Sequence, residues 1–366
     1  MLDVLTGRML RSISPIATGA LWLSLACSSS DGAPKNPGDP GGAGSGLPTA
    51  GASSGPAGAT SGGTSATSGG AASGGTSATS GGSVSVAASG GTSSGQAGAS
   101  AGSTGAANPL LDKFSFFVTS LASIKVVSSN PEGFGGDLRF GEVGDGAGLR
   151  GADKICKAIA ELGMPGAGTK QWRAFLSTTS GGPDGGPVHA KDRVGKGPWY
   201  DAAGRLVAMT LADLIGADRP IGADPVIRND LPNEFGIPNH TADAPGCTGS
   251  QCPDNHQILT GTNCSGELYT GGGSGGGVIS TCQNAAPSSG TPDPAFTCSD
   301  WTSKAAEGSP WCGHSWPRQG SGLSWMSSAR DGGCAPCVRL EENGGVNEQC
   351  VGSAGGYGGF YCFVES

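Results

Sequence analysis

The stretch that decides the fold is Gly148-Leu-Arg-Gly-Ala-Asp-Lys-Ile-Cys-Lys-Ala-Ile-Ala-Glu-Leu-Gly163, followed closely by Gln171-Trp-Arg-Ala-Phe-Leu-Ser177. In the first segment the apolar residues recur at helical spacing and form one face: Ala152, Ile155, Cys156, Ile159 and Leu162. Glycine at position 163 suits the residue that ends a helix. In the second segment apolar and other side chains alternate as in a strand. We predict a helix over 148–163 and a buried strand over 171–177.

Two cysteines mark the ends of one predicted domain. Cys156 lies on the apolar face of the helix, and Cys362 lies in the closing apolar run Gly359-Phe-Tyr-Cys-Phe-Val364, which reads as a strand. We predict that these two cysteines form a disulfide. The chain has 12 cysteines, and such a density in an exported chain predicts a set of disulfides.

The first third of the chain has the composition of a linker. Residues 41–107 contain 61 Gly, Ala, Ser or Thr in 67 positions, and no charged residue occurs from Pro40 to Leu111. Such a segment buries too little apolar surface to offset its ordering entropy. We therefore predict a disordered tether over 28–112 and one folded domain over 113–366.

The N-terminus has the features of an export signal. Arg8 and Arg11 precede a moderately apolar stretch that ends in Leu23-Ser-Leu-Ala-Cys27. This ending resembles the lipobox of bacterial lipoproteins, in which the cysteine is lipidated and becomes the mature N-terminus. The resemblance implies a signal peptide over 1–27, lipidation at Cys27 and a location at the outer membrane or cell surface. Simple secretion is the alternative.

The other cysteines suggest local bridges. Cys247 and Cys252 form a predicted short clip, and Cys264 and Cys282 flank a glycine-rich loop that they would close. Cys334-Ala-Pro-Cys337 lacks a second CxxC and a βαβ context, so we predict two cysteines in different bridges rather than a redox or zinc pair. Eleven cysteines remain after Cys27, and we predict that the unpaired one is Cys350.

The remaining elements are short. We predict strands over 114–120 and 338–341, a hairpin over 199–208 and a short helix over 209–215. Residues 216–297 are mostly Gly, Pro, Asn, Asp and Ser, which predicts one long irregular region. A loop of this length in a compact domain usually has a function.

In this order the segments resemble the C-type-lectin-like fold, and more narrowly its endostatin-like branch, as found on tethered bacterial surface lipoproteins. Three stretches carry the likeness: Gly148–Cys156; Arg173–Ser177; and Leu259-Thr-Gly-Thr-Asn-Cys-Ser-Gly-Glu-Leu268 with Cys298-Ser-Asp-Trp-Thr302 after it. The resemblance implies an α+β domain with two short helices, small antiparallel sheets and a long irregular disulfide-linked loop region. It also implies an outer bridge Cys156–Cys362 and an inner bridge Cys298–Cys334.

Calcium-dependent lectins of this fold bind sugar through Glu-Pro-Asn or Gln-Pro-Asp in the long loop and Trp-Asn-Asp on the next strand. This chain has the partial matches Leu231-Pro-Asn-Glu234 and Gln251-Cys-Pro-Asp-Asn255, and Cys298-Ser-Asp-Trp301 does not supply the last motif. If calcium is a cofactor, its oxygen ligands would be Asp230, Asn233, Glu234, Asp254 and Asn255. The alternative is that these residues are ordinary turn formers.

Signals for an enzyme are weak. Gly313-His-Ser-Trp-Pro317 has Pro in place of the last Gly of a nucleophile elbow. The four histidines have no close metal-binding spacing, although His240 and His256 would suit zinc if they converged with Asp243 or Asp254. The net charge of -8 argues against nucleic acid as a partner.

The sequence therefore predicts a surface lipoprotein with a non-catalytic, lectin-like domain that binds a glycan or a protein. Its predicted binding surface is the loop region 216–296, with Trp311 and Trp316 as exposed aromatic side chains that stack on sugars. The alternative is an exported enzyme with His and Asp residues of that loop region in its site.

Overall fold

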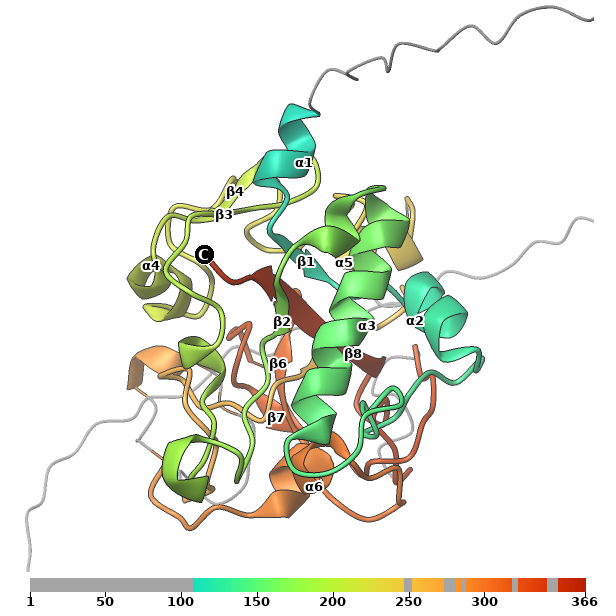
Figure 1. The fold of residues 1–366 in the computed structure, drawn as a ribbon, viewed down its shortest axis with the longest axis vertical. Helices are drawn as coiled ribbons and strands as arrows, with labels where there is room; N and C mark the ends of the chain where they lie inside the picture. Colours follow the sequence, from blue (N-terminus) through green and yellow to red (C-terminus); the bar gives the residue numbers. More distant parts are fainter. Residues whose placement is uncertain are drawn as a thin grey trace, which may run out of the picture. The chain divides into compact units, whose positions relative to one another are not determined.

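The computed structural model describes residues 108–246, 252–272, 279, 281–284, 288–317, 322–340 and 348–366. The predicted signal peptide, Cys27 and almost all of the predicted tether lie outside these residues. The described part is a mixed α+β structure in which one long helix lies beside a small sheet (Figure 1). The α+β class predicted from the sequence is thus confirmed.

The long helix α3 spans Ala147–Gly163 and has the buried face that its sequence predicts. Ala152, Ile155, Cys156 and Ile159 are completely buried, whereas Leu162, at the last turn, is 45% exposed. The helix ends at Met164, whose backbone is extended and whose N–H donates to the carbonyl of Ala160.

The main sheet has six strands, and β8 (Gly356–Val364) lies at its centre. β8 pairs antiparallel with β1 (Phe116–Val118) and β2 (Trp172–Ala174), and parallel with β5 (Gln257–Leu259). The antiparallel strands β6 (Trp311–His314) and β7 (Ala329–Arg330) complete the sheet beyond β5. The first and last segments of the domain therefore meet in one sheet. The sheets are small, as predicted, but the pairing of β5 with β8 is parallel, whereas the sequence predicted antiparallel sheets.

Both faces of the central strands are buried. Phe117, Phe360 and Cys362 belong to a core that includes α3, whereas Phe116, Tyr361 and Phe363 belong to a second core with Phe175 and Trp325. A strand that is covered on both sides reads as a continuous apolar run, as the end of β8 does.

The hairpin of β3 (Trp199–Tyr200) and β4 (Leu206–Ala208) and the short helix α4 (Leu211–Ile215) lie where the sequence predicts them. The further helices are short: α1 (Pro109–Lys113), α2 (Leu121–Ser128), α5 (Asn239–Asp243) and α6 (Cys298–Trp301), with the 3-10 turns Ala167–Thr169, Pro183–Gly185, Ala190–Asp192, Cys282–Asn284 and Pro294–Thr297.

Two of the short helices need comment. α2 was not predicted, because the sequence suggested a glycine-rich connection after the first strand; its N-cap Ser120 accepts from the Ser123 N–H. In α6 all four residues have positive φ, between 47° and 63°, so this turn is left-handed.

The predicted strand over 338–341 is wrong within its described residues, since only Arg339 forms a bridge, to Gly356.

Four disulfides lie entirely within the described residues. Cys156–Cys362, Cys264–Cys282 and Cys298–Cys334 confirm three predicted pairs. The fourth, Cys337–Cys350, corrects the prediction that Cys350 is unpaired; the free cysteine is Cys312, which is buried. The two cysteines of the CxxC lie in different bridges, as predicted. Cys252 is also disulfide-bonded, and its predicted partner, Cys247, lies outside the described residues.

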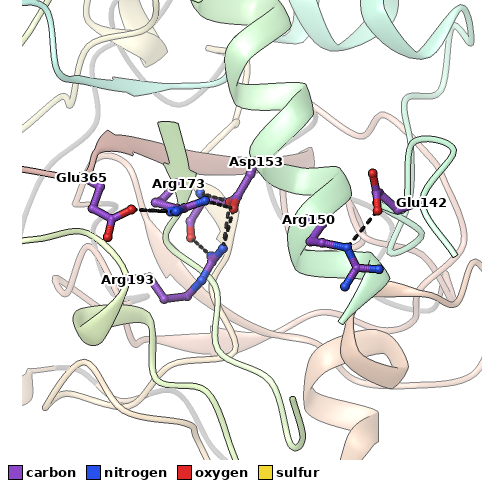
Figure 2. Close-up of polar contacts among 7 residues, drawn as sticks. Glu142, Arg150, Asp153, Arg173, Arg193 and Glu365 are labelled. Carbon is purple, nitrogen blue, oxygen red and sulfur yellow. Dashed lines mark hydrogen bonds and ion pairs between the residues drawn. The ribbon is translucent and has the colours of Figure 1, made fainter. Parts of the chain in front are cut away.

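A buried carboxylate ties α3 to the sheet (Figure 2). Asp153 is 6% exposed and accepts from the Ala174 N–H at 2.9 Å. It also accepts from Arg193 Nη2 at 2.8 Å and from Arg173 Nη1 at 3.1 Å. Arg173 in turn donates to Glu365 at 2.8 Å. One side chain thus links α3, β2, the segment after Ala190 and the C-terminal end.

Asp153→Asn should lower the free energy of unfolding by about 3 kcal/mol, because breaking a buried ion pair leaves the partner charges uncompensated. Urea unfolding followed by tryptophan fluorescence measures this change. Glu142→Gln is the control, since Glu142 contacts Arg150 at 2.8 Å on the exposed side of α3 (Figure 2) and should hardly shift the midpoint. Equal effects of the two substitutions would contradict the structural role of Asp153.

Candidate functional site

Three residues of the proposed calcium set hold backbone turns and helix ends. Asn233 Oδ1 accepts from the N–H groups of Phe235 and Ile237, at 3.0 and 3.2 Å. Asp230 accepts from the N–H groups of His240, at 2.8 Å, and Thr241, at 3.1 Å, at the start of α5.

Glu234 points into the protein rather than toward solvent. It is completely buried, and its carboxylate accepts from the Ser120 N–H at 3.0 Å and from the hydroxyls of Ser120 and Ser123. Burial raises the pKa of Glu234, although these hydrogen bonds oppose the rise. The carboxylate lies at the N-terminal end of α2, where a negative charge is favourable.

The last two residues of the set also have protein partners. Asp254 contacts the Nδ1 of His256, and Asn255 Nδ2 donates to the carbonyl of Asn239 at 3.1 Å and to Asp243 at 2.6 Å. Within the described residues the only group of three close metal-ligand side chains is Cys337, Glu348 and Cys350, whose two cysteines are bonded to each other. The three proposed carboxylate ligands, Asp230, Glu234 and Asp254, are thus not part of a close group of His, Cys, Asp and Glu side chains among the described residues.

The prediction that Trp311 is exposed is wrong. Trp311 lies in β6 between two other strands and is 1% exposed. Its ring stacks on Tyr269 with 3.7 Å between centroids, and its indole N–H donates to Ser327 Oγ at 2.9 Å. A short strand with both faces covered gives no alternation from which its burial can be predicted.

Trp316 is half-buried and is the centre of a cluster of polar aromatic residues. Its ring lies 4.0 Å from the half-buried ring of His240 and 6.0 Å from that of His256. His256 in turn makes an edge contact of 4.3 Å with His314. The structure thus brings together three of the four histidines, from segments far apart in sequence. We call Trp316, His240 and Asn255 the Trp316 surface.

Asn255 fixes the geometry of the Trp316 surface. Its Oδ1 accepts from the indole N–H of Trp316 at 2.9 Å and lies 3.3 Å from Nδ1 of His240. Its Nδ2 donates to Asp243. Burial raises the pKa of Asp243, and the hydrogen bond from Asn255 opposes this rise. Both aromatic rings are therefore attached to one buried amide, which lets them keep one arrangement before any ligand binds.

The buried hydroxyl of Tyr357 holds Asn239, whose carbonyl accepts from the Asn255 side chain. Asn239 Nδ2 donates to the Tyr357 hydroxyl at 2.9 Å, and that hydroxyl donates to the carbonyl of Thr119 at 3.0 Å. Burial raises the pKa of Tyr357 well above its ordinary value. No signal in the sequence pointed to Asn239 or Tyr357, because they lie 118 positions apart and belong to the short helix α5 and to strand β8, which share no motif.

The geometry gives little support to a nucleophile in Gly313–Pro317. Ser315 is completely buried, and its Oγ donates to the carbonyl of Asn255 at 3.5 Å. His314 Nδ1 lies 3.3 Å from Ser328 Oγ and 3.2 Å from the carbonyl of Gly322. The Asp254–His256 pair is also buried, at 3% and 2% exposed. These side chains contact protein groups rather than an open surface.

The chain matches no protein-family model and no curated protein sequence. Among the described residues, none of the helices is both long enough and apolar enough to cross a membrane. The function is therefore argued from the Trp316 surface and the sequence features alone.

Proposed function

We propose that this chain is a bacterial surface lipoprotein that displays a non-catalytic, lectin-like domain, and that the domain binds a glycan at the Trp316 surface. The observation that carries the proposal is the half-buried pair of Trp316 and His240 rings held by one amide. Rings that combine an apolar face with a polar edge suit ligands that have both kinds of surface. Sugars are such ligands.

The C-type-lectin-like assignment is part of this proposal. It is supported by the Cys156–Cys362 and Cys298–Cys334 bridges, which join the pairs that the resemblance implies. The antiparallel pairing of β1 with β8 adds support, because it brings the two ends of the domain together. The proposed lectin-like domain would include the six-stranded sheet and the parallel pairing of β5 with β8.

Trp316→Ala should reduce glycan binding by about 10-fold or more, because aromatic side chains at the centre of a binding surface contribute on the order of 2 kcal/mol. The measurement is binding of the full chain to a glycan array, followed by calorimetry on the best ligand. Phe140→Ala is the control, because Phe140 is an aromatic residue that is 41% exposed in another segment and should leave binding unchanged.

The array should be read with calcium and with a chelator. We expect equal binding, because at least one side-chain oxygen of each of the five proposed calcium ligands already contacts a protein group. Unchanged glycan binding by a folded Trp316→Ala variant would contradict the proposed site. Binding to a protein partner that no sugar displaces would replace the glycan by a protein ligand.

An exported hydrolase is the second candidate, favoured by the contact between Asp254 and His256, which is the orienting contact of a general base. Because both side chains are buried, a substrate would reach them only if neighbouring side chains moved. Hydrolysis of a glycan by the full chain that is lost in His256→Ala would favour this candidate over simple binding.

Cys27→Ala should abolish incorporation of labelled palmitate when the full chain is expressed in a bacterium, because a lipobox cysteine is the acylated residue. The measurement is labelling followed by membrane fractionation, and the variant should leave the membrane fraction. Cys312→Ala is the control, since it removes a buried free thiol and should keep the label. Palmitate that remains on Cys27→Ala would show that another residue is acylated, whereas an unaltered chain without palmitate would favour simple secretion.

A further inference from the structure

A polar cavity of about 380 Å³ lies at the end of β7, away from the residues of the Trp316 surface. It is lined by Ser309, Arg330, Asp331, Gly332, Ser353 and Ala354. Its volume is at the small end of the range for ligand sites and would accommodate one sugar ring. The groups that line it indicate the chemistry of the ligand that would fit.

Arg330 supplies the charge of this cavity. It is exposed on the edge strand β7, where its backbone pairs with Trp311, and its guanidinium makes no hydrogen bond or ion pair with the described residues. A guanidinium presents a planar set of N–H donors that matches a carboxylate in two parallel hydrogen bonds. Because none of these donors is occupied by the described residues, the guanidinium can bind an anion without first breaking a contact with them.

The one carboxyl group of the cavity does not cancel that charge. Asp331 is 1% exposed; its Oδ2 lies 3.3 Å from the Cys312 thiol, and its Oδ1 makes no hydrogen bond with a described residue. Burial raises the pKa of Asp331 to about 8, although the Ser353 hydroxyl and the Ala354 amide lie near enough to oppose the rise. At pH 7 this group is therefore mainly a neutral acid.

The remaining polar groups of the cavity are hydroxyls. Ser353 Oγ accepts from the Gly332 N–H at 2.6 Å. Its hydroxyl also lies beside the Asp331 carboxyl, and it can turn to donate to a ligand while Asp331 is neutral. The Ser309 hydroxyl has no partner among the described residues, and its backbone N–H donates to Ala295 at 2.9 Å. The cavity therefore offers one cation and two hydroxyl donors and, at neutral pH, little negative charge.

We propose that this cavity binds a small carboxylate of the size of one uronic acid ring, with Arg330 as the group that binds the carboxylate. The site shares no residue with the Trp316 surface and does not depend on the function proposed there. Neutral sugars lack the charged group that Arg330 recognises and should bind much more weakly.

The test is calorimetric titration of the full chain with glucuronate and, separately, with glucose. We expect saturable binding of glucuronate, at least 10-fold weaker binding of glucose, and at least a 10-fold loss for glucuronate in Arg330→Gln. Arg228→Gln is the matched control, because Arg228 is an exposed arginine on another segment and should bind like the unaltered chain. A thermal melt of each variant confirms that it is folded.

Binding should also weaken between pH 7 and pH 9, because ionised Asp331 would repel the carboxylate. Asp331→Asn should lose this pH dependence. Equal affinity for glucuronate and glucose, no saturable binding of glucuronate, or unchanged binding by Arg330→Gln would each overturn the proposal. None of these results depends on Trp316→Ala, so the two proposed sites are tested separately.

Discussion

Replacing both cysteines of the Cys156–Cys362 bridge by Ala should lower the free energy of unfolding by roughly 5 kcal/mol. The bridge joins residues 206 positions apart, and it connects the buried face of α3 to the central strand of the sheet. In the unfolded chain its loss frees a very long loop, whose closure entropy accounts for most of the effect.

The nested bridges change this expectation little. Cys264–Cys282, Cys298–Cys334 and Cys337–Cys350 lie inside the large loop and shorten it by 18, 36 and 13 positions. Because the closure entropy depends on the logarithm of the length, the expected loss stays near 5 kcal/mol. The measurement is urea unfolding without reductant, monitored by tryptophan fluorescence.

The control for this experiment is removal of Cys264–Cys282 by the same pair of Ala substitutions. Its separation of 18 positions predicts a loss of roughly 3 kcal/mol. If removing the long bridge costs no more than removing the short one, the bridge does not constrain the chain ends in the way that the sheet topology implies.

Asp331→Asn should stabilise the domain by about 4 kcal/mol at pH 7. The pKa of Asp331 is about 8 in the folded domain, against an ordinary value of 3.8. Between these two values the unfolded chain loses this proton while the folded domain keeps it. Stability therefore falls as the pH rises from about 4 to about 8, and each pKa unit corresponds to about 1.4 kcal/mol.

The substitution removes this pH dependence because an amide does not titrate. Chemical unfolding at pH 4 and pH 7 measures it: we expect little effect at pH 4 and the full gain at pH 7. Asp201→Asn is the control with the opposite sign, since completely buried Asp201 accepts from the Arg205 N–H at 2.8 Å and from its guanidinium and should destabilise. Destabilisation by Asp331→Asn at pH 7 would show that the carboxyl is ionised in the folded domain.

The helix over 148–163 and a strand within 171–177 were predictable because a long periodic pattern and a bounded apolar run are local properties of the chain. The strand is shorter than predicted, since only Trp172–Ala174 pairs in the sheet. The disulfide of Cys156 and Cys362 was predictable for a related reason: both cysteines lie on apolar segments that must be buried. The helix α2 was missed because its residues, Leu121–Ser128, follow a strand without a strong helical period, and its N-terminal end is completed by Glu234 from a distant turn.

The candidate site was less predictable than the fold. Asp230, Asn233 and Glu234 were chosen as calcium ligands from a tripeptide pattern, but their oxygens accept hydrogen bonds from backbone and hydroxyl groups. Short polar motifs specify turns and helix caps as readily as metal sites. Which of these roles applies depends on the donors that the fold places beside them.

By itself, the sequence determined the α+β class, the long helix and the pairs Cys156–Cys362 and Cys264–Cys282, because periodicity, composition and the segments that carry the cysteines can be read along the chain. The pair Cys298–Cys334 was implied only by the resemblance to the lectin-like fold. Only the tertiary structure decided that Trp311 is buried while Trp316 is half-buried, that Cys312 rather than Cys350 is free, and that Arg330 lies beside a neutral Asp331. Burial, pairing and charge state are properties of neighbours brought together by the β8 sheet, and those neighbours come from positions that no local pattern connects.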